Sequence, residues 1–111
     1  MPVSPEYREF VLEQLGRVAP VTARSMFGGV GVYSGGMIFA LLSDDTLYLK
    51  VDDATRPDFQ AAGMGPFNPS GDGKHVMQYY ELPAELLEDT DRLRAWMFAA
   101  IDVARRARAG K

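Results

Sequence analysis

The sequence predicts an α+β domain in which helices pack on one antiparallel sheet of about five strands, in the order α-β-β-β-β-α-β-α. Three observations lead to this class. Apolar residues recur at helical spacing near both ends of the chain, and short runs of β-forming residues fill the middle. The links between consecutive runs are only a few turn-forming residues long. Because links that short join antiparallel neighbours, we expect the strands to form a meander.

The bulk composition fits a single domain over residues 1–111. A chain of 111 residues can bury one core but not two. It has 47% hydrophobic and 24% charged residues, a balance typical of a folded globular protein. The sequence has no apolar run of about 20 residues and no visible secretory signal, so we expect a cytoplasmic protein without membrane contact. The absence of cysteine excludes disulfides, thiolate nucleophiles and cysteine zinc sites.

The first helix is predicted to begin after Ser4 and to end before Pro20. Ser4 is a suitable N-cap, and Pro5 suits the first helical position because its missing N–H would have no partner there. Apolar residues then follow helical spacing and are predicted to form one buried stripe. These residues are Tyr7, Phe10, Val11, Leu15 and Val18.

Two more helices are predicted in the second half of the chain. A short one covers residues 54–63, and a long one starts near Ala84 or Asp91 and closes at Gly110. The long helix carries apolar residues at three- and four-residue spacing, so one side of it is expected to face the sheet. Between these helices, residues 64–74 are rich in Gly, Pro, Asn and Ser and are predicted to form a flexible loop.

Strands are predicted at residues 21–27, 30–33, 37–42, 47–51 and 75–82. The third run is apolar at successive positions, and therefore on both faces, which indicates a central strand. The fourth run alternates apolar and polar residues, as expected for a strand with one buried face. The second, third and fourth runs are separated by short turn sequences, so consecutive strands are expected to pair.

The segment RSMFGGVGVYSGG, residues 24–36, has the glycine content of a phosphate-binding loop. It lacks the Gly-Lys-Ser/Thr ending of a P-loop, and β-forming residues rather than a helix follow its glycines, which also excludes a dinucleotide fingerprint. We interpret the glycines as backbone geometry. Gly28 and Gly29 would permit a bulge or a positive φ between strands, and Gly35 and Gly36 would form the next turn.

The sequence predicts no catalytic residue, metal site or cofactor. His75 is the single histidine, and no second ligand stands near it at metal-binding spacing. The acidic pairs Asp44-Asp45 and Asp52-Asp53 follow strands, where aspartate is a common turn or N-cap residue. We therefore expect a protein that is not an enzyme.

Positive charge is concentrated at the C-terminus, although the net charge is −3. Residues 92–111 carry six Lys and Arg side chains against one acidic residue, Asp102. One interpretation is that these cations stabilise the negative end of the final helix. The other is that Arg105, Arg106 and Arg108 contact nucleic acid.

A series of short motifs runs through the chain from about residue 6 to residue 105. They comprise Arg24-Ser25-Met26-Phe27-Gly28-Gly29, then Gly31, Tyr33, Gly36-Met37 and Phe39-Ala40, then Asp45-Thr46-Leu47-Tyr48-Leu49-Lys50, Ala62-Gly63, Pro66-Phe67, Tyr79-Tyr80-Glu81-Leu82-Pro83 and a helix with Trp96.

In their order, these motifs resemble the N-terminal domain of the TfoX/Sxy family of competence regulators. The resemblance implies a secretion-chaperone-like α+β fold and a transcriptional co-regulator, which acts with the cyclic-AMP receptor protein at competence promoters. It implies no catalytic residue. The family's best-known members carry a second, helical C-terminal domain. Because this chain ends at Lys111, we expect a stand-alone N-terminal domain.

The sequence thus favours a non-enzymatic regulatory or adaptor domain that binds a protein partner or a second copy of itself. The alternative is a small-ligand-binding domain or enzyme that holds an anionic ligand near Arg24, Lys50 and His75. For the favoured hypothesis, the expected contact residues are those of the glycine-rich hairpin: Arg24, Ser25, Met26, Phe27, Gly28 and Gly29.

Overall fold

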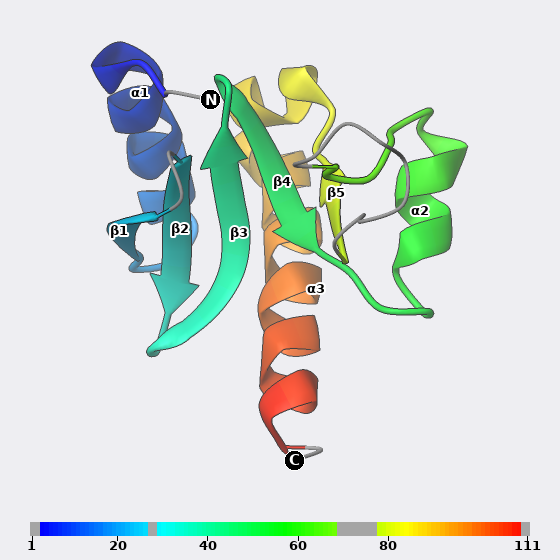
Figure 1. The fold of residues 1–111 in the computed structure, drawn as a ribbon. Coiled ribbons are helices and arrows are strands. Elements are labelled where there is room, and N and C mark those ends of the chain that lie inside the picture. Colours follow the sequence, from blue (N-terminus) through cyan, green and yellow to red (C-terminus); the bar gives the residue numbers. More distant parts are fainter. Residues whose placement is uncertain (1–2, 27–28, 69–77, 110–111) are drawn as a thin grey trace.

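The computed structural model of the chain describes residues 3–26, 29–68 and 78–109 (Figure 1). It confirms the predicted α+β class and the order of the elements, with one short 3-10 helix in addition. The elements are α1 (Pro5–Gly16), β1 (Thr22–Met26), β2 (Gly29–Ser34), β3 (Met37–Ser43), β4 (Thr46–Lys50), α2 (Arg56–Ala61), β5 (Tyr79–Glu81), η1 (Ala84–Glu88) and α3 (Thr90–Ala109).

The five strands form one antiparallel meander in the order β1-β2-β3-β4-β5. The apolar strand β3 is central, as its sequence predicts. Figure 1 shows α1 and α3 on the same face of this sheet, with α3 crossing behind β3 and β4. The opposite face carries no helix among the described residues, so the sheet has one helix-covered face and one helix-free face.

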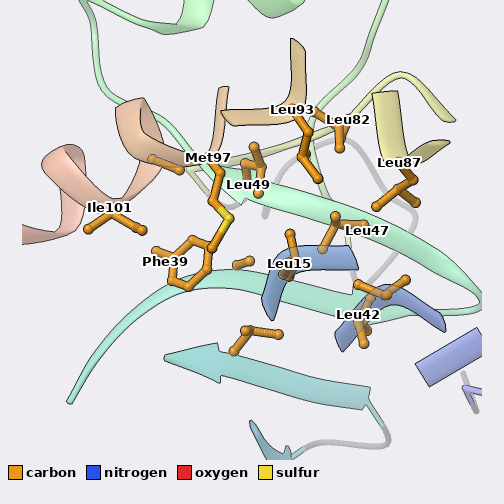
Figure 2. Close-up of a cluster of buried hydrophobic side chains, with 14 of the residues drawn as sticks. Leu15, Phe39, Leu42, Leu47, Leu49, Leu82, Leu87, Leu93, Met97 and Ile101 are labelled. Carbon is orange, nitrogen blue, oxygen red and sulfur yellow. The ribbon is translucent and has the colours of Figure 1, made fainter. Parts of the chain in front are cut away.

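The hydrophobic core fills the space between the helix-covered face and the helices. In β4, Leu47 and Leu49 are buried while Tyr48 and Lys50 are partly exposed, which confirms the predicted alternation. In Figure 2 the leucines of β3 and β4 lie beside side chains of α1 and α3. The α3 side chains labelled there are Leu93, Met97 and Ile101.

A bulge in β3 turns two consecutive side chains into this core. Val32 pairs with Ala40 and Tyr33 pairs with Ile38, so Phe39 is an extra residue without a partner in β2. Phe39 and Ala40 both have 0% exposure and both belong to the core cluster. A bulge of this kind locally breaks the two-residue alternation of a strand. It accounts for the two successive core residues of β3, Phe39 and Ala40.

Helix α1 begins as predicted but ends early. The Ser4 hydroxyl accepts a hydrogen bond from the Tyr7 backbone N–H at 3.2 Å, so Ser4 is the N-cap. The helix stops at Gly16, before the expected limit at Pro20. The predicted buried stripe is wrong at Phe10, which is 38% exposed. Since successive residues are about 100° apart around a helix, Phe10 points away from the face that buries its neighbour.

Two-residue turns join β2 to β3 and β3 to β4. Gly35 and Gly36 have φ of +58° and +81°, and Ser34 pairs with Met37 on either side of them. Asp44 and Asp45 both have φ of 53°. Positive φ at both central residues is the type I′ pattern that matches strand twist. The predictions that these two glycines and two aspartates form turns are therefore confirmed.

The turn geometry predicts opposite effects for the same substitution at two glycines. Gly36→Ala should lower the free energy of unfolding by about 1–2 kcal/mol, because a Cβ is unfavourable at positive φ. Gly16→Ala should raise it by about 0.5–1 kcal/mol, because alanine favours the helix. An added Cβ meets no atom within 4 Å at either site, so packing does not obscure the comparison. Urea denaturation measures both, and equal signs would contradict the assignment.

Residues 64–68, the first part of the predicted flexible loop, are held by backbone hydrogen bonds to β5. The Phe67 N–H donates to the Tyr79 carbonyl at 2.7 Å, and the Glu81 N–H donates to the Gly65 carbonyl at 3.0 Å. Pro66 forms a bridge to Tyr80. This segment therefore runs along the outer edge of β5. The rest of the predicted loop and the first residues of the predicted last strand, including His75, lie outside the described residues.

The phenol of Tyr7 on α1 is influenced by the charge of Asp45 in the β3–β4 turn. Its ionisation makes the stability of the fold depend on pH in the alkaline range. Its burial, together with the Asp45 carboxylate, raises the pKa of Tyr7 from 10.0 to about 12. Between these values the unfolded chain loses a proton that the folded chain keeps, so stability falls as pH rises. Burial also raises the pKa of Tyr48 and of Tyr79, which add to the same slope.

We therefore expect Tyr7→Phe to reduce this loss of stability between about pH 10 and about pH 12. Urea denaturation at several pH values, for Tyr7→Phe and for the wild type, measures the difference in slope. The predicted result is a shallower slope in the variant. Identical slopes would show that the Tyr7 phenol ionises equally in both states.

Candidate functional site

An open groove of about 610 Å³ lies between α1 and the paired strands β1 and β2. We call it the α1–hairpin groove. Its charged side chains come from α1, and its apolar surface comes from both sides. The residues that define it are Arg8, Glu9, Leu12, Ser25, Gly29 and Val30.

Two of the predicted hairpin residues, Ser25 and Gly29, line this groove. Met26 pairs with Gly29, and Ser25 pairs with Val30, so Ser25 follows the wall of the groove along β1. Phe27 and Gly28, and the side chain of Met26, lie outside the described part of the chain. Because neighbouring side chains of a strand point to opposite faces, Arg24 projects from the helix-free face.

Arg24 is an exposed cation that forms no ion pair within the described residues. Its partner across the sheet is Gly31, which offers no side chain. The guanidinium can therefore bind a carboxylate without first breaking a contact with the described residues. An arginine donates short, charge-assisted hydrogen bonds to a carboxylate beside it.

The α1 side of the groove carries an unused hydrogen-bond donor. The Nε atom of Arg8 is buried, and no acceptor in the described residues reaches it. Buried polar groups in folded proteins are nearly always paired, so an unpaired donor at a groove wall is unusual. Glu9 stands beside it on the same helix and adds an acceptor to the wall. The groove thus combines apolar surface with two side chains of opposite charge, Arg8 and Glu9.

The structure does not bring together the residues of the predicted anion site. Arg24 lies in β1 and Lys50 in β4, which are three strand spacings or about 14 Å apart across a sheet. The Lys50 ammonium lies 5.2 Å from the centre of the Tyr79 ring, an arrangement that a cation–π attraction stabilises. His75 lies outside the described residues. A small anion could not contact Arg24 and Lys50 together.

The basic residues near the C-terminus contact acidic groups of the same chain. Arg105 pairs with Asp102 at 3.4 Å. Arg106 pairs with Asp102 and also with Asp52, whose Oδ2 lies 2.6 Å from its Nη2. The hydrogen bond from Arg106 lowers the pKa of the Asp52 carboxyl. The side chain of Arg108 lies outside the described part.

The contact of Arg106 with Asp52 joins the end of α3 to the start of α2. Asp52 also accepts hydrogen bonds from the backbone N–H groups of Ala54 and Thr55, at 3.0 and 3.1 Å. This confirms the prediction that Asp52 is a turn residue. No local pattern in the sequence indicates its pairing with Arg106, because 54 positions separate the two. Arg106 thus has a structural contact in addition to any role in nucleic-acid binding.

A smaller cleft of about 330 Å³ lies between α2 and α3. Phe59 of α2 packs edge-on against Trp96 of α3, with ring centres 4.8 Å apart and an interplanar angle of 89°. Asp58 is the charged residue of the cleft's lining.

In the described ranges, no helix is long and apolar enough to cross a bilayer, and no three potential metal ligands come together.

Comparison with known proteins agrees with the motif order. The TfoX N-terminal domain family matches residues 13–104, which is 92 of the 111 residues. None of the curated proteins matches the chain. The matched range contains the whole sheet, the glycine-rich hairpin and most of α3. The chain therefore belongs to the TfoX N-terminal domain family.

Proposed function

We propose that this TfoX N-terminal domain is a regulatory domain that acts by binding another protein, and that the α1–hairpin groove with strand β1 is its contact surface. The observation that carries the proposal is the position of the groove. Two residues of the RSMFGG motif, Ser25 and Gly29, are part of its wall. This motif is the first in the series of motifs by which the sequence resembles the family.

The chemistry of the groove supports a protein as the ligand. Leu12 and Val30 give it apolar surface, while Arg8 and Glu9 stand beside them. An apolar centre with polar groups around it is the common pattern of protein interfaces. The resemblance to competence co-regulators favours a transcription regulator as the class of partner.

Site-specific crosslinking in cells tests this proposal. A photoreactive amino acid replaces Ser25 at the groove, and the matched control carries it at Asp91, an exposed position of α3. We expect one or a few protein adducts from Ser25 that Asp91 does not give. Each crosslinked protein is identified by mass spectrometry and purified, and its affinity is measured.

A charge change in the groove then links the adduct to the proposed surface. Glu9→Arg alters an exposed side chain, so the fold should be unaffected. It should weaken binding of the purified partner by about tenfold, the order of effect that one misplaced charge has at an interface. Equal adducts from Ser25 and Asp91, or an affinity unchanged by Glu9→Arg, would argue against the groove as the contact surface.

A further inference from the structure

The two edge strands of the sheet, β1 and β5, differ in whether their outer sides are paired. At β5 the chain covers its own edge, through the hydrogen bonds of residues 65–67 to Tyr79 and Glu81. At the other edge, β1 pairs only with β2 within the described residues. Figure 1 shows β1 at the margin of the sheet, next to α1. One edge is therefore closed by the chain itself and the other is open.

Strand β1 has few of the features that usually protect an open edge. Its sequence is Thr-Ala-Arg-Ser-Met, with no proline and a single charge at Arg24. Edges are commonly blocked by proline, by several charges, by a bulge or by covering segments. Five residues paired on one side leave alternate backbone N–H and C=O groups directed outward. These groups can form hydrogen bonds with another extended chain.

We infer that β1 accepts an extended segment of the partner protein as a sixth strand, with an acidic side chain beside Arg24 and apolar side chains in the α1–hairpin groove. This inference rests on the proposed function, because it specifies how the same surface recognises its partner. Addition of a strand to a sheet edge is a general mode of peptide recognition, in which main-chain hydrogen bonds give affinity and alternate side chains give specificity.

The geometry of β1 fixes which side chains of the segment go where. A strand added to β1 would lie about 4.8 Å from it, with its side chains alternating between the same two faces. Those on the face of Ser25 would continue into the groove, toward Leu12 and Val30. Side chains of the segment on the face of Arg24 would lie beside its guanidinium. The pattern expected in the segment is an acidic residue with an apolar residue on either side.

A second copy of this chain fits the edge less well. An antiparallel pair of β1 strands that uses all five residues is centred on Arg24, so two guanidinium groups would stand directly opposite each other. Like charges in that position destabilise a strand pair. A shift by one residue on either copy relieves the repulsion but leaves only three or four residues paired. The surface therefore fits a foreign acidic segment better than its own β1.

Selection from a displayed library of random linear peptides tests the inference. We expect the enriched peptides to carry Asp or Glu flanked on both sides by apolar residues. N-methylation of an amide that faces β1 should lower the affinity by about fivefold, the value of one hydrogen bond. N-methylation of the adjacent amides should have little effect. Peptides without the acidic–apolar pattern, or with affinities insensitive to N-methylation, would overturn strand addition.

Charge reversal at Arg24 tests the orientation of the segment. Arg24→Glu should fold normally, because Arg24 is exposed and forms no ion pair in the described part of the chain. It should select Lys or Arg in place of the acidic residue. The matched control Arg94→Glu, at an exposed position of α3, should still select Asp or Glu. The same selection by both variants would contradict a role for Arg24.

The outcomes separate this inference from the proposed function. Protein adducts from Ser25 combined with patternless peptides would overturn strand addition while the proposed function stands. Absence of both would overturn both. A dimer in light scattering whose crosslinks join β1 to β1 would make the second copy the occupant and would also overturn the inference.

Discussion

Phe39→Ala is expected to lower the free energy of unfolding by about 3–5 kcal/mol, the largest effect of any single substitution considered for this domain. Phe39 has 0% exposure and is the extra residue of the β3 bulge. Its ring lies next to Met97 of α3 in Figure 2. Truncation would remove contacts between the centre of the sheet and the helix that covers it, and it would leave a cavity in the core.

Phe98→Ala is the matched control for this prediction. Phe98 lies on α3 but is 44% exposed, so the same loss of a ring should change stability by no more than about 1 kcal/mol. Urea denaturation followed by circular dichroism measures both variants. Similar losses for Phe39→Ala and Phe98→Ala would contradict the assignment of Phe39 to the core.

Phe59→Ala is expected to cost about 3 kcal/mol and to loosen α2 from α3. Phe59 is 3% exposed and is the buried residue of this short helix. It contacts Trp96 edge-on and lies 6.1 Å from the ring of Tyr80. Because a six-residue helix is not stable alone, losing this contact should expose Trp96 to water.

The single tryptophan of the chain reports this change directly. Trp96 emission should shift to longer wavelength in Phe59→Ala under conditions where the rest of the domain stays folded. Phe67→Ala is the matched control, because the ring of Phe67 contacts that of Tyr48, with ring centres 4.8 Å apart, on the other face of the sheet. An unchanged emission in Phe59→Ala, or an equal shift in Phe67→Ala, would contradict the role of Phe59.

The sequence predicts most of the fold because its local signals agree with each other. Ser4 and Pro5 mark the start of α1, and the positive-φ turns at residues 35–36 and 44–45 fix which strands pair. Helical and strand periodicity then show which faces are buried. Periodicity failed at Phe10 and could not reveal the bulge at Phe39, because both depend on how elements meet in space.

The candidate site was predicted only in part. The motif order indicates the family and makes residues 24–29 the predicted contact residues. No local pattern shows that α1 lies across a groove from Ser25 and Gly29. Arg8 and Glu9 were therefore missed, although their charges on a helix next to Leu12 could have suggested a polar wall. The pairing of Arg106 with Asp52 was missed for the same reason, since contacts between distant positions leave no local pattern.

Hydrogen exchange in the complex with the crosslinked partner tests the central claim most directly. The claim is that the partner binds along β1 and the α1–hairpin groove. It predicts that exchange at alternate backbone amides of Thr22–Met26 slows by about tenfold or more on binding, while amides of β4 and α3 keep their rates. Protection confined to the α2–α3 cleft or to the basic end of α3, with β1 unchanged, would contradict it.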